Sequence, residues 1–449
     1  MSTPVKNSIL EGSLQAPTRH PLDWQSPEFY DEGALFHELE RVFDICHGCR
    51  RCFSLCNAFP LLFDAIDDTE SGELDTLPKK VYWKVVDHCY LCDVCYMTKC
   101  PYVPPHEFNL DFPHLMLRAK AIKYRKGDTK FRDNLITRTD LIGKLASIPV
   151  VSTITNLVNR STLGRKALEA GLGIHPNAIL PEYHSDTLFR RLKKREPIDS
   201  VNPGTTTKGK VILFSTCYGN YNEPGVAEDL VKVFEHNKIQ VRLMEDSRCC
   251  GMPRLELGDL KGVAALKAHN LPRLAAWVDA GWDLVAPVPS CVLMFKQELP
   301  LMFPEDPEVA KVKKAFFDPF EYLMLRHKDQ LLNTNFPRPL GKVLYHVPCH
   351  LRVQNLGFKT KECLQLVPGT EVEVIERCSG HDGTYAIKSE FHEDSMKIAR
   401  PVVNRVLKAE ADWYGSDCPM AGHQIENGLG RTREPVPPLT LLRIAYGLP

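Results

Sequence analysis

Short apolar runs alternate with stretches of helical periodicity in the carboxy-terminal part of the chain. The pattern runs once from residue 210 to residue 286 and returns from residue 342 to residue 414. Buried strands that alternate with helices are typical of parallel α/β sheets. We therefore predict two pseudo-repeated parallel α/β halves, at 209–335 and 336–449. The expected strands are 210–215, 240–244, 283–286, 342–346, 371–375 and 412–414, and the expected helices are 224–236, 257–280, 360–366 and 390–410.

The amino-terminal part has a helical pattern. Leu35, Leu39 and Val42 recur at helical spacing, and further helices are expected at 79–87 and from Pro113 to about residue 126. The predicted divisions are an arm with an entry helix at 1–40, a helical ferredoxin-like domain at 41–130, and a helical connector with a linker at 131–208.

The connector is amphipathic from Leu135 to Leu168, with one interruption at Pro149. The plainest interpretation is a set of helices packed on the next domain. The alternative is a surface that contacts a membrane or a partner protein. The pattern leaves both open.

Composition narrows the class of protein. The 449 residues include 56 basic and 56 acidic side chains, and this balance gives no basic footprint for a nucleic-acid partner. The sixteen cysteines come without an apolar leader in the first forty residues, which favours metal-binding thiols in a reducing compartment over disulfides. No apolar stretch reaches the ~18 residues of a membrane span. We expect a cytoplasmic protein, or one peripheral on the inner face of a membrane.

Two runs of cysteine in the helical domain have the spacing of bacterial ferredoxins. The run at 46–56 is C-x2-C-x2-C-x3-C, and the run at 89–100 differs only in a last step that is one residue longer. Three thiolates at this spacing surround one [4Fe–4S] cube, and the fourth ligates the other cube. A pair of zinc knuckles is the alternative. The predicted ligand sets are Cys46, Cys49, Cys52 and Cys100 for one cube, and Cys89, Cys92, Cys95 and Cys56 for the other.

Seven further cysteines follow predicted strands of the α/β halves. Sites in parallel sheets gather beyond the carboxyl ends of the strands, so these thiols should converge. Cys363 falls inside a predicted helix instead and is expected to be a core thiol. The set of the first half is Cys217, Cys249, Cys250 and Cys291, and the set of the second half is Cys349, Cys378 and Cys418.

The whole pattern resembles the cysteine-cysteine-glycine iron–sulfur oxidoreductases. This family includes the iron–sulfur subunits of anaerobic glycerol-3-phosphate dehydrogenase and glycolate oxidase, and heterodisulfide reductase. The resemblance rests on the two ferredoxin-type runs, on Cys249-Cys250-Gly251 and on Cys378-Ser379-Gly380, and it covers about residues 40–449. It implies an electron-transfer subunit that works beside a flavoprotein or another redox subunit and passes electrons towards quinone. It does not specify the substrate.

The chain departs from the family pattern of a lone cysteine, a Cys-Cys-Gly and a closing C-x-x-C in each half. Val288 replaces one cysteine in the first half, and Ser379 and Ala421 replace two in the second. Four thiolates suit a cube or tetrahedral zinc, whereas three leave one metal position open. His381 is the first choice for a fourth ligand or proton donor there. Hydrogen-bonded core histidines are the alternative for His346, His350, His381 and His423.

These observations favour an oxidoreductase subunit with two [4Fe–4S] clusters and a further cluster or zinc in one or both α/β halves. The predicted catalytic residues are Cys349, Cys378, Cys418 and His381. No G-x-G-x-x-G fingerprint is present, so flavin or nicotinamide chemistry is expected on another chain. Two alternatives stay open: a non-catalytic zinc or iron–sulfur scaffold with an eroded second half, and thiol redox chemistry at Cys249-Cys250.

Overall fold

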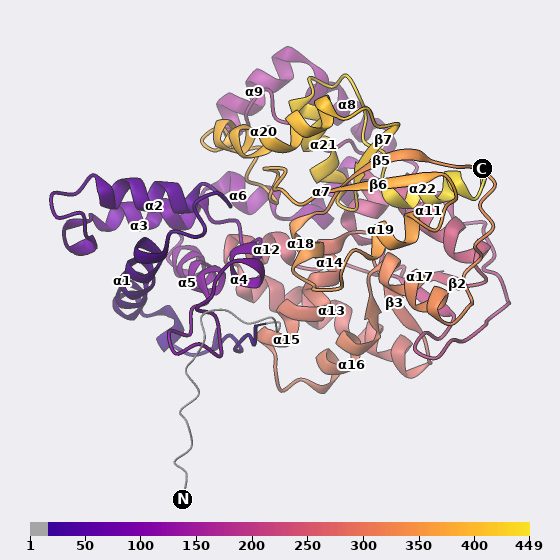
Figure 1. Ribbon diagram of the computed structural model, residues 1–449, viewed down its shortest axis with the longest axis horizontal. Helices are drawn as coiled ribbons and strands as arrows, with labels where there is room; N and C mark the ends of the chain where they lie inside the picture. Colours follow the sequence, from indigo (N-terminus) through magenta and orange to yellow (C-terminus); the bar gives the residue numbers. More distant parts are fainter. Residues whose placement is uncertain (1–16) are drawn as a thin grey trace, which may run out of the picture.

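The structure is a computed structural model that describes residues 17–449. Residues 1–16 of the predicted arm lie outside the described residues. The helical amino-terminal domain lies at one side of the molecule, and the two α/β halves make up the rest (Figure 1).

The amino-terminal domain is helical, as predicted. The first helix, α1, begins at the capping residue Asp31, whose carboxylate accepts a hydrogen bond from the Ala34 N–H at 2.6 Å. It continues beyond the predicted end to Cys49 and stops where Arg50 turns into the left-handed region at φ 53°. The elements are η1 (Glu28–Tyr30), α1 (Glu32–Cys49), α2 (Ala58–Asp67), η2 (Leu74–Thr76), α3 (Lys79–His88), α4 (Val94–Thr98) and α5 (Phe112–Arg125).

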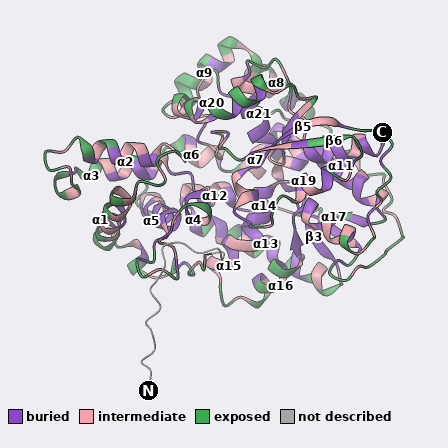
Figure 2. Cartoon of the chain, viewed as in Figure 1, coloured by how far each residue is buried: buried purple, intermediate pink, exposed green. Residues whose placement is uncertain are grey.

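The connector forms helices that cover one side of the second half (Figure 1). Pro149 does not break a helix but begins one, because proline is well suited to the first helical position. Much of α8 and α9 is exposed (Figure 2). The elements are α6 (Phe131–Ile136), α7 (Thr139–Ala146), α8 (Pro149–Arg160), α9 (Thr162–Leu172) and α10 (Leu188–Arg191).

The first half contains a four-stranded parallel sheet in the order β2-β1-β3-β4. The strands are β1 (Lys210–Leu213), β2 (Gln240–Leu243), β3 (Asp283–Val285) and β4 (Phe316–Phe317). The edge strand β4 was not predicted, because two residues are too short to show a period. The helices are η3 (Tyr218–Asn222), α11 (Pro224–His236), α12 (Met252–Leu257), α13 (Leu260–Asp279), α14 (Pro289–Leu293), η4 (Met294–Glu298), α15 (Leu299–Met302), α16 (Pro307–Ala315) and α17 (Pro319–Lys328).

The second half contains a three-stranded parallel sheet in the order β6-β5-β7. Its strands are β5 (Gly341–His346), β6 (Thr370–Ile375) and β7 (Trp413–Ser416). Its helices are α18 (Cys349–Arg352), α19 (Lys359–Leu364), α20 (His392–Lys408), α21 (Pro419–Gly428) and α22 (Pro438–Ala445). The prediction of two repeated parallel α/β halves is therefore confirmed.

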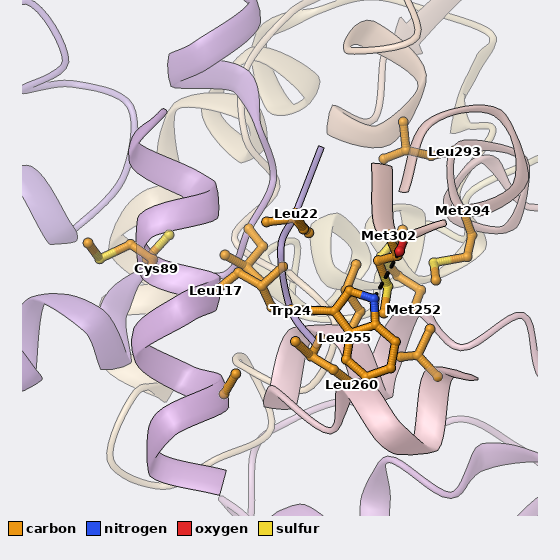
Figure 3. Close-up of a cluster of buried hydrophobic side chains, with 14 of the residues drawn as sticks. Leu22, Trp24, Cys89, Leu117, Met252, Leu255, Leu260, Leu293, Met294 and Met302 are labelled. Carbon is orange, nitrogen blue, oxygen red and sulfur yellow. Dashed lines mark hydrogen bonds between the residues drawn. The ribbon is translucent and has the colours of Figure 1, made fainter. Parts of the chain in front are cut away.

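One hydrophobic core joins the amino-terminal domain to the first half. The described part of the arm is a strap across this junction: Leu22 and Trp24 are buried, and the Trp24 indole N–H donates to the Met302 carbonyl at 2.9 Å. Figure 3 shows Trp24 among Leu255, Leu260 and Met302. Burying each such side chain contributes roughly 1.5–3 kcal/mol. The amino-terminal domain is thus fixed against the first half.

A buried ion cluster strengthens the same junction. The Arg19 guanidinium donates to Asp93 at 3.0 Å and to Asp111 at 2.8 Å, and lies 3.6 Å from Glu298 of η4. Asp93 lies between Cys92 and Cys95, so the arm fixes the second cysteine run against the first half. Breaking such a buried pair from one side costs about 3–5 kcal/mol.

Candidate metal centres

The cysteines of the amino-terminal domain gather in two groups. The first thiol group, which consists of Cys46, Cys49, Cys52 and Cys100, lines one pocket together with Phe59 and Phe63. Helix α1 supplies its first two members, and the turn after α4 supplies Cys100. Burial and the neighbouring cysteine thiols raise the pKa of Cys46 well above its ordinary value.

The second thiol group consists of Cys56, Cys89, Cys92 and Cys95. Burial, followed by the charges of Cys89 and Cys92, raises the pKa of Cys56. Cys95 is affected by all three other members of its group. The structure thus brings together both predicted sets, each with one cysteine taken from the other run.

The chemistry of these donors fits a cationic metal core. Burial, as the largest cause, raises the pKa of Cys52 to about 12 and that of Cys89 to about 12. Four thiolates crowded in an apolar pocket repel one another, and a positively charged centre removes this cost. All eight side chains are free cysteines, so sulfur ligands are available at each position.

The third thiol group lies in the first half and consists of Cys217, Cys249, Cys250 and Cys291. Its members interact as two pairs that share the vicinal cysteines: Cys217 with Cys249, and Cys250 with Cys291. Gly251 permits the turn because its φ of +105° lies in the region that favours glycine, and its N–H points at the Cys249 sulfur at 3.5 Å. All four predicted thiols of this half therefore converge.

The fourth thiol group lies in the second half and is mixed in chemistry. The ligand atoms of Cys349, Cys378 and Asp382 lie within 4.8 Å of one another. The Cys378 thiol donates to the Asp382 carboxylate at 3.3 Å, and the Gly380 N–H points at the Cys378 sulfur at 3.2 Å. Two thiols and a carboxyl group can hold a metal ion and leave it a free position.

Cys418 is near this group without being one of the three ligands that meet. It caps the N-terminus of α21, where the backbone N–H groups of Met420 and Ala421 point at its sulfur, while burial raises its pKa to about 11. The charges of Asp382 and Asp417 act on it in addition. The predicted three-thiol set of the second half is therefore only two-thirds assembled around one point, and Asp382 occupies the remaining place.

The four candidate histidines have different surroundings. His346 is buried, and its two ring nitrogens face Ser416 Oγ at 3.0 Å and the Arg377 carbonyl at 2.8 Å, which is the role of a core histidine. The His423 ring lies 2.8 Å from both Glu223 and Glu426, and these partners outweigh burial and raise its pKa to about 9. His423 thus forms an ion pair between the halves.

His350 and His381 lie closer to the thiols. The His350 ring is 2.8 Å from Ser290 Oγ and also bonds the Leu91 backbone, so it joins segments that precede Cys291 and Cys92. Burial, followed by the charges of His423 and His350, lowers the pKa of His381 to about 4. His381 is a neutral side chain next to the fourth thiol group, but not one of the three ligands that meet there.

The sequence analysis missed Asp382 and Tyr90. Asp382 precedes Gly383, so its position resembles an ordinary Asp-Gly turn, and its φ of 40° fits such a turn. The only signal was its spacing of four residues from Cys378. Tyr90 lies between Cys89 and Cys92 in sequence; its buried hydroxyl lies near Asp382 and Cys378 without a hydrogen bond of regular geometry.

Contacts between thiols connect the groups. The thiol of Cys349 interacts with both Cys378 and Cys92, so the second and fourth groups touch. Cys95 is affected by Cys52, which brings the first and second groups close. Tyr218 of η3 lies near Cys217 and Cys418, between the third and fourth groups.

A cavity of about 540 Å³ opens beside the second and fourth groups. Burial raises the pKa of its Glu256 to about 7, while the ammonium groups of Lys120 and Lys388 act in the opposite direction. Aromatic faces are supplied by Tyr385 and Phe391, which stack with ring centroids 4.7 Å apart. The lining also includes Cys89, Tyr90 and Asp382.

Comparisons with known proteins agree with this arrangement. The family described as "Cysteine-rich domain" (CCG) matches residues 211–296 and 343–426, one copy in each half. One of the subunits of anaerobic glycerol-3-phosphate dehydrogenase from Escherichia coli K12 is 29% identical over 336 residues, which are 73% of this chain and 80% of that protein. Lactate utilization protein A from Bacillus cytotoxicus is 29% identical over 216 residues, 46% of this chain and 87% of that protein.

The chain is therefore a protein with two CCG cysteine-rich domains. It is homologous to this subunit of anaerobic glycerol-3-phosphate dehydrogenase and to lactate utilization protein A. The resemblance deduced from the cysteine pattern is confirmed.

Proposed function

We propose that the chain is the iron–sulfur subunit of a redox complex and transfers electrons between a partner and the fourth thiol group. The first and second thiol groups would each hold a [4Fe–4S] cluster, and the third a further cluster or zinc. Metal binding would bring low-potential redox chemistry, while the chain supplies the ligands, their burial and the hydrogen bonds to sulfur.

The observation that carries this proposal is the contact between Cys92 and Cys349. One belongs to the ferredoxin-type run and the other to the second CCG domain, so a redox centre in either group has its nearest sulfur next to the other. Together with the approach of Cys52 to Cys95, this gives an order of transfer from the first group through the second to the fourth.

The partner we propose is a flavoprotein. The chain has no dinucleotide fingerprint, and one of its relatives is by name one subunit of a dehydrogenase, so substrate oxidation would take place on another chain. Asp382 and the neutral His381 would bind or move protons beside the open metal position.

The test is anaerobic purification of the full chain with iron, sulfide and zinc analysis. The proposal predicts at least about eight irons, four for each of two cubes, with labile sulfide and a reducible paramagnetic signal. Stoichiometric zinc without sulfide would refute it and favour the scaffold alternative.

We further propose that the onward acceptor is a quinone, whose reduction takes up two electrons and two protons. The cavity supports this, because aromatic rings and Glu256 lie beside Cys89. A water-soluble quinone should reoxidise the reduced chain, and Glu256→Gln should slow this at least about 10-fold. Glu169→Gln, at an exposed position on α9, is the control. Equal rates in all three proteins would argue against the cavity.

A second observation favours contact with a membrane surface. Among the described residues no single helix is long and apolar enough to cross a membrane, and α7 and α8 meet that test only as a pair that is bent by 109°. The surface formed by α7, α8 and α9 nevertheless exposes large apolar side chains. They include Val150 at 70%, Leu157 at 67% and Leu163 at 82% exposure.

Charge points to an anionic lipid surface as the occupant. Segment 134–168 has five basic residues and one acidic residue, and Lys144, Arg160 and Lys166 are exposed. Basic groups beside an exposed apolar helix face are typical of interfacial binding. The chain should float with anionic phospholipid vesicles and not with zwitterionic ones. Leu157→Glu with Leu163→Glu should abolish this, whereas Leu407→Glu, 64% exposed on α20, should not.

A further inference from the structure

Thr139, the first residue of α7, reaches the third thiol group from outside the CCG domain. Its hydroxyl lies 3.4 Å from the Cys249 sulfur, to which it donates, and 3.2 Å from the Cys217 sulfur, from which it accepts. The connector has no cysteine, so a search for ligand residue types passes over this segment.

The hydroxyl is the oxygen that completes an otherwise all-sulfur site. Val288 stands where a further cysteine would close the motif, so the half offers four thiols. A cysteine sulfur bound to metal has lost its proton and can only accept hydrogen bonds. In that state the Thr139 hydroxyl can no longer accept from Cys217 and is a donor to one of the two sulfurs.

Packing holds the hydroxyl at the thiols. Gly143, one turn after Thr139, lies against the Tyr221 ring so closely that a Cβ at this position would be 2.3 Å from a ring carbon. Tyr221 belongs to η3, the segment that directly follows Cys217. Helix α7 and the backbone of Cys217 are therefore fixed to each other, and the threonine needs no rearrangement to reach the sulfur.

We propose that Thr139 is a positioning residue that tunes the metal at the third thiol group through a hydrogen bond to cysteine sulfur. The proposal rests on the proposed function, because it takes the third group to hold a metal. Hydrogen bonds to cluster sulfurs stabilise the reduced, more negative state and so raise the reduction potential. They also stabilise metal-bound thiolate against protonation and loss of the metal.

The experiment compares the anaerobic full-length protein with Thr139→Val and Thr139→Ser. Valine has the shape of threonine without the hydroxyl, and serine retains the hydroxyl. Thr153→Val, at an exposed position on α8, is the matched control. Two quantities are measured: the midpoint potential of the third group by redox titration with electron paramagnetic resonance, and the rate at which its metal is lost to a chelator.

Thr139→Val should lower the midpoint potential and lose its metal at least about 10-fold faster, while Thr139→Ser and Thr153→Val should match the wild type. If the third group holds zinc, the release rate alone gives the answer. A wild-type site that retains metal, with Thr139→Val unchanged in both quantities, would overturn the role of Thr139 and leave the proposed function intact. A wild-type third group without metal would overturn both the metal assignment and this inference.

Discussion

The two CCG domains share one fold and differ in what their strands deliver. The third thiol group has four cysteines around one point, with Val263 and Met294 packed beside the Cys-Cys-Gly turn. The fourth group has two cysteines and Asp382 around one point, with Cys418 set apart and neutral His381 close by. One repeat is closed by sulfur, and the other is open and polar.

This difference indicates a division of labour. Metal sites with a full set of protein ligands hold structure or store electrons, whereas sites with an open position do chemistry. The open repeat is also the one whose Cys349 touches Cys92 and whose Asp382 lines the large cavity. Electron entry, proton-carrying groups and space for a ligand therefore coincide at the second half only.

The sharpest way to break the comparison is to remove one thiol from each repeat. Cys378→Ala should reduce partner-dependent electron transfer by roughly 100-fold or more, because it removes a ligand of the working site. Cys291→Ala should mainly reduce retention of metal at the third group, at least about 10-fold. Turnover assays with metal analysis of the same samples check this. Equal effects on turnover would erase the distinction between the repeats.

Removing the cysteine that crosses between runs should isolate the fourth group. Cys56 lies with Cys89 and Cys92, not with the rest of its own run. Cys56→Ala should lower the iron content by up to about four atoms and interrupt transfer to the second half. Iron analysis and the electron paramagnetic resonance spectrum give the answer. Loss of the signal of the first thiol group instead would show that the ligands do not cross over.

A smaller change tests whether the carboxylate matters as a ligand. Asp382→Asn should reduce turnover about 10–100-fold and leave the third group untouched. His381→Ala should have a comparable effect on turnover if this neutral imidazole donates or accepts the proton, and it is measured in parallel. The control is His346→Gln, which alters a histidine bound only to Ser416 and a backbone carbonyl. Wild-type turnover for both Asp382→Asn and His381→Ala would remove the chemistry from the second half.

The smallest expected effect concerns the pH dependence of stability. Burial raises the pKa of Glu256 to about 7, so the folded state binds a proton that the unfolded state has already released above its ordinary pKa. Stability from this group is present at low pH and is lost as pH rises towards 7, by up to about 3 kcal/mol. Glu256→Gln should therefore raise the apparent Tm by several degrees at about pH 8 and by little at about pH 5. An unchanged Tm difference between the two conditions would contradict this.

Much of the fold could be predicted because strands of parallel sheets are continuous apolar runs. The strands at β1, β2 and β5 and the helix α11 follow the predicted ranges closely. The cysteines also specified their own neighbours, since a ferredoxin spacing determines which thiols can surround one point. The connector helices followed from amphipathic periodicity, although Pro149 begins α8 and does not merely interrupt it.

The fourth group could be predicted only in part, because its composition depends on a turn. The Cys-Ser-Gly turn directs the side chain of Asp382, not that of His381, towards Cys349 and Cys378, and one residue of difference reverses the assignment. Contacts such as Cys92 with Cys349 join residues far apart in sequence, and no local pattern encodes them. Thr139 was missed for the same reason.

The central claim is that the fourth thiol group accepts electrons through the second. The most direct measurement is freeze-quench Mössbauer and electron paramagnetic resonance spectroscopy of the full chain labelled with ⁵⁷Fe and reduced anaerobically. We predict an iron signal that changes on reduction, interacts magnetically with the second thiol group, and is absent from Cys378→Ala while the ferredoxin-type signals remain. A fourth group that contains zinc, or whose iron stays in one oxidation state while the second group is reduced, would contradict the account.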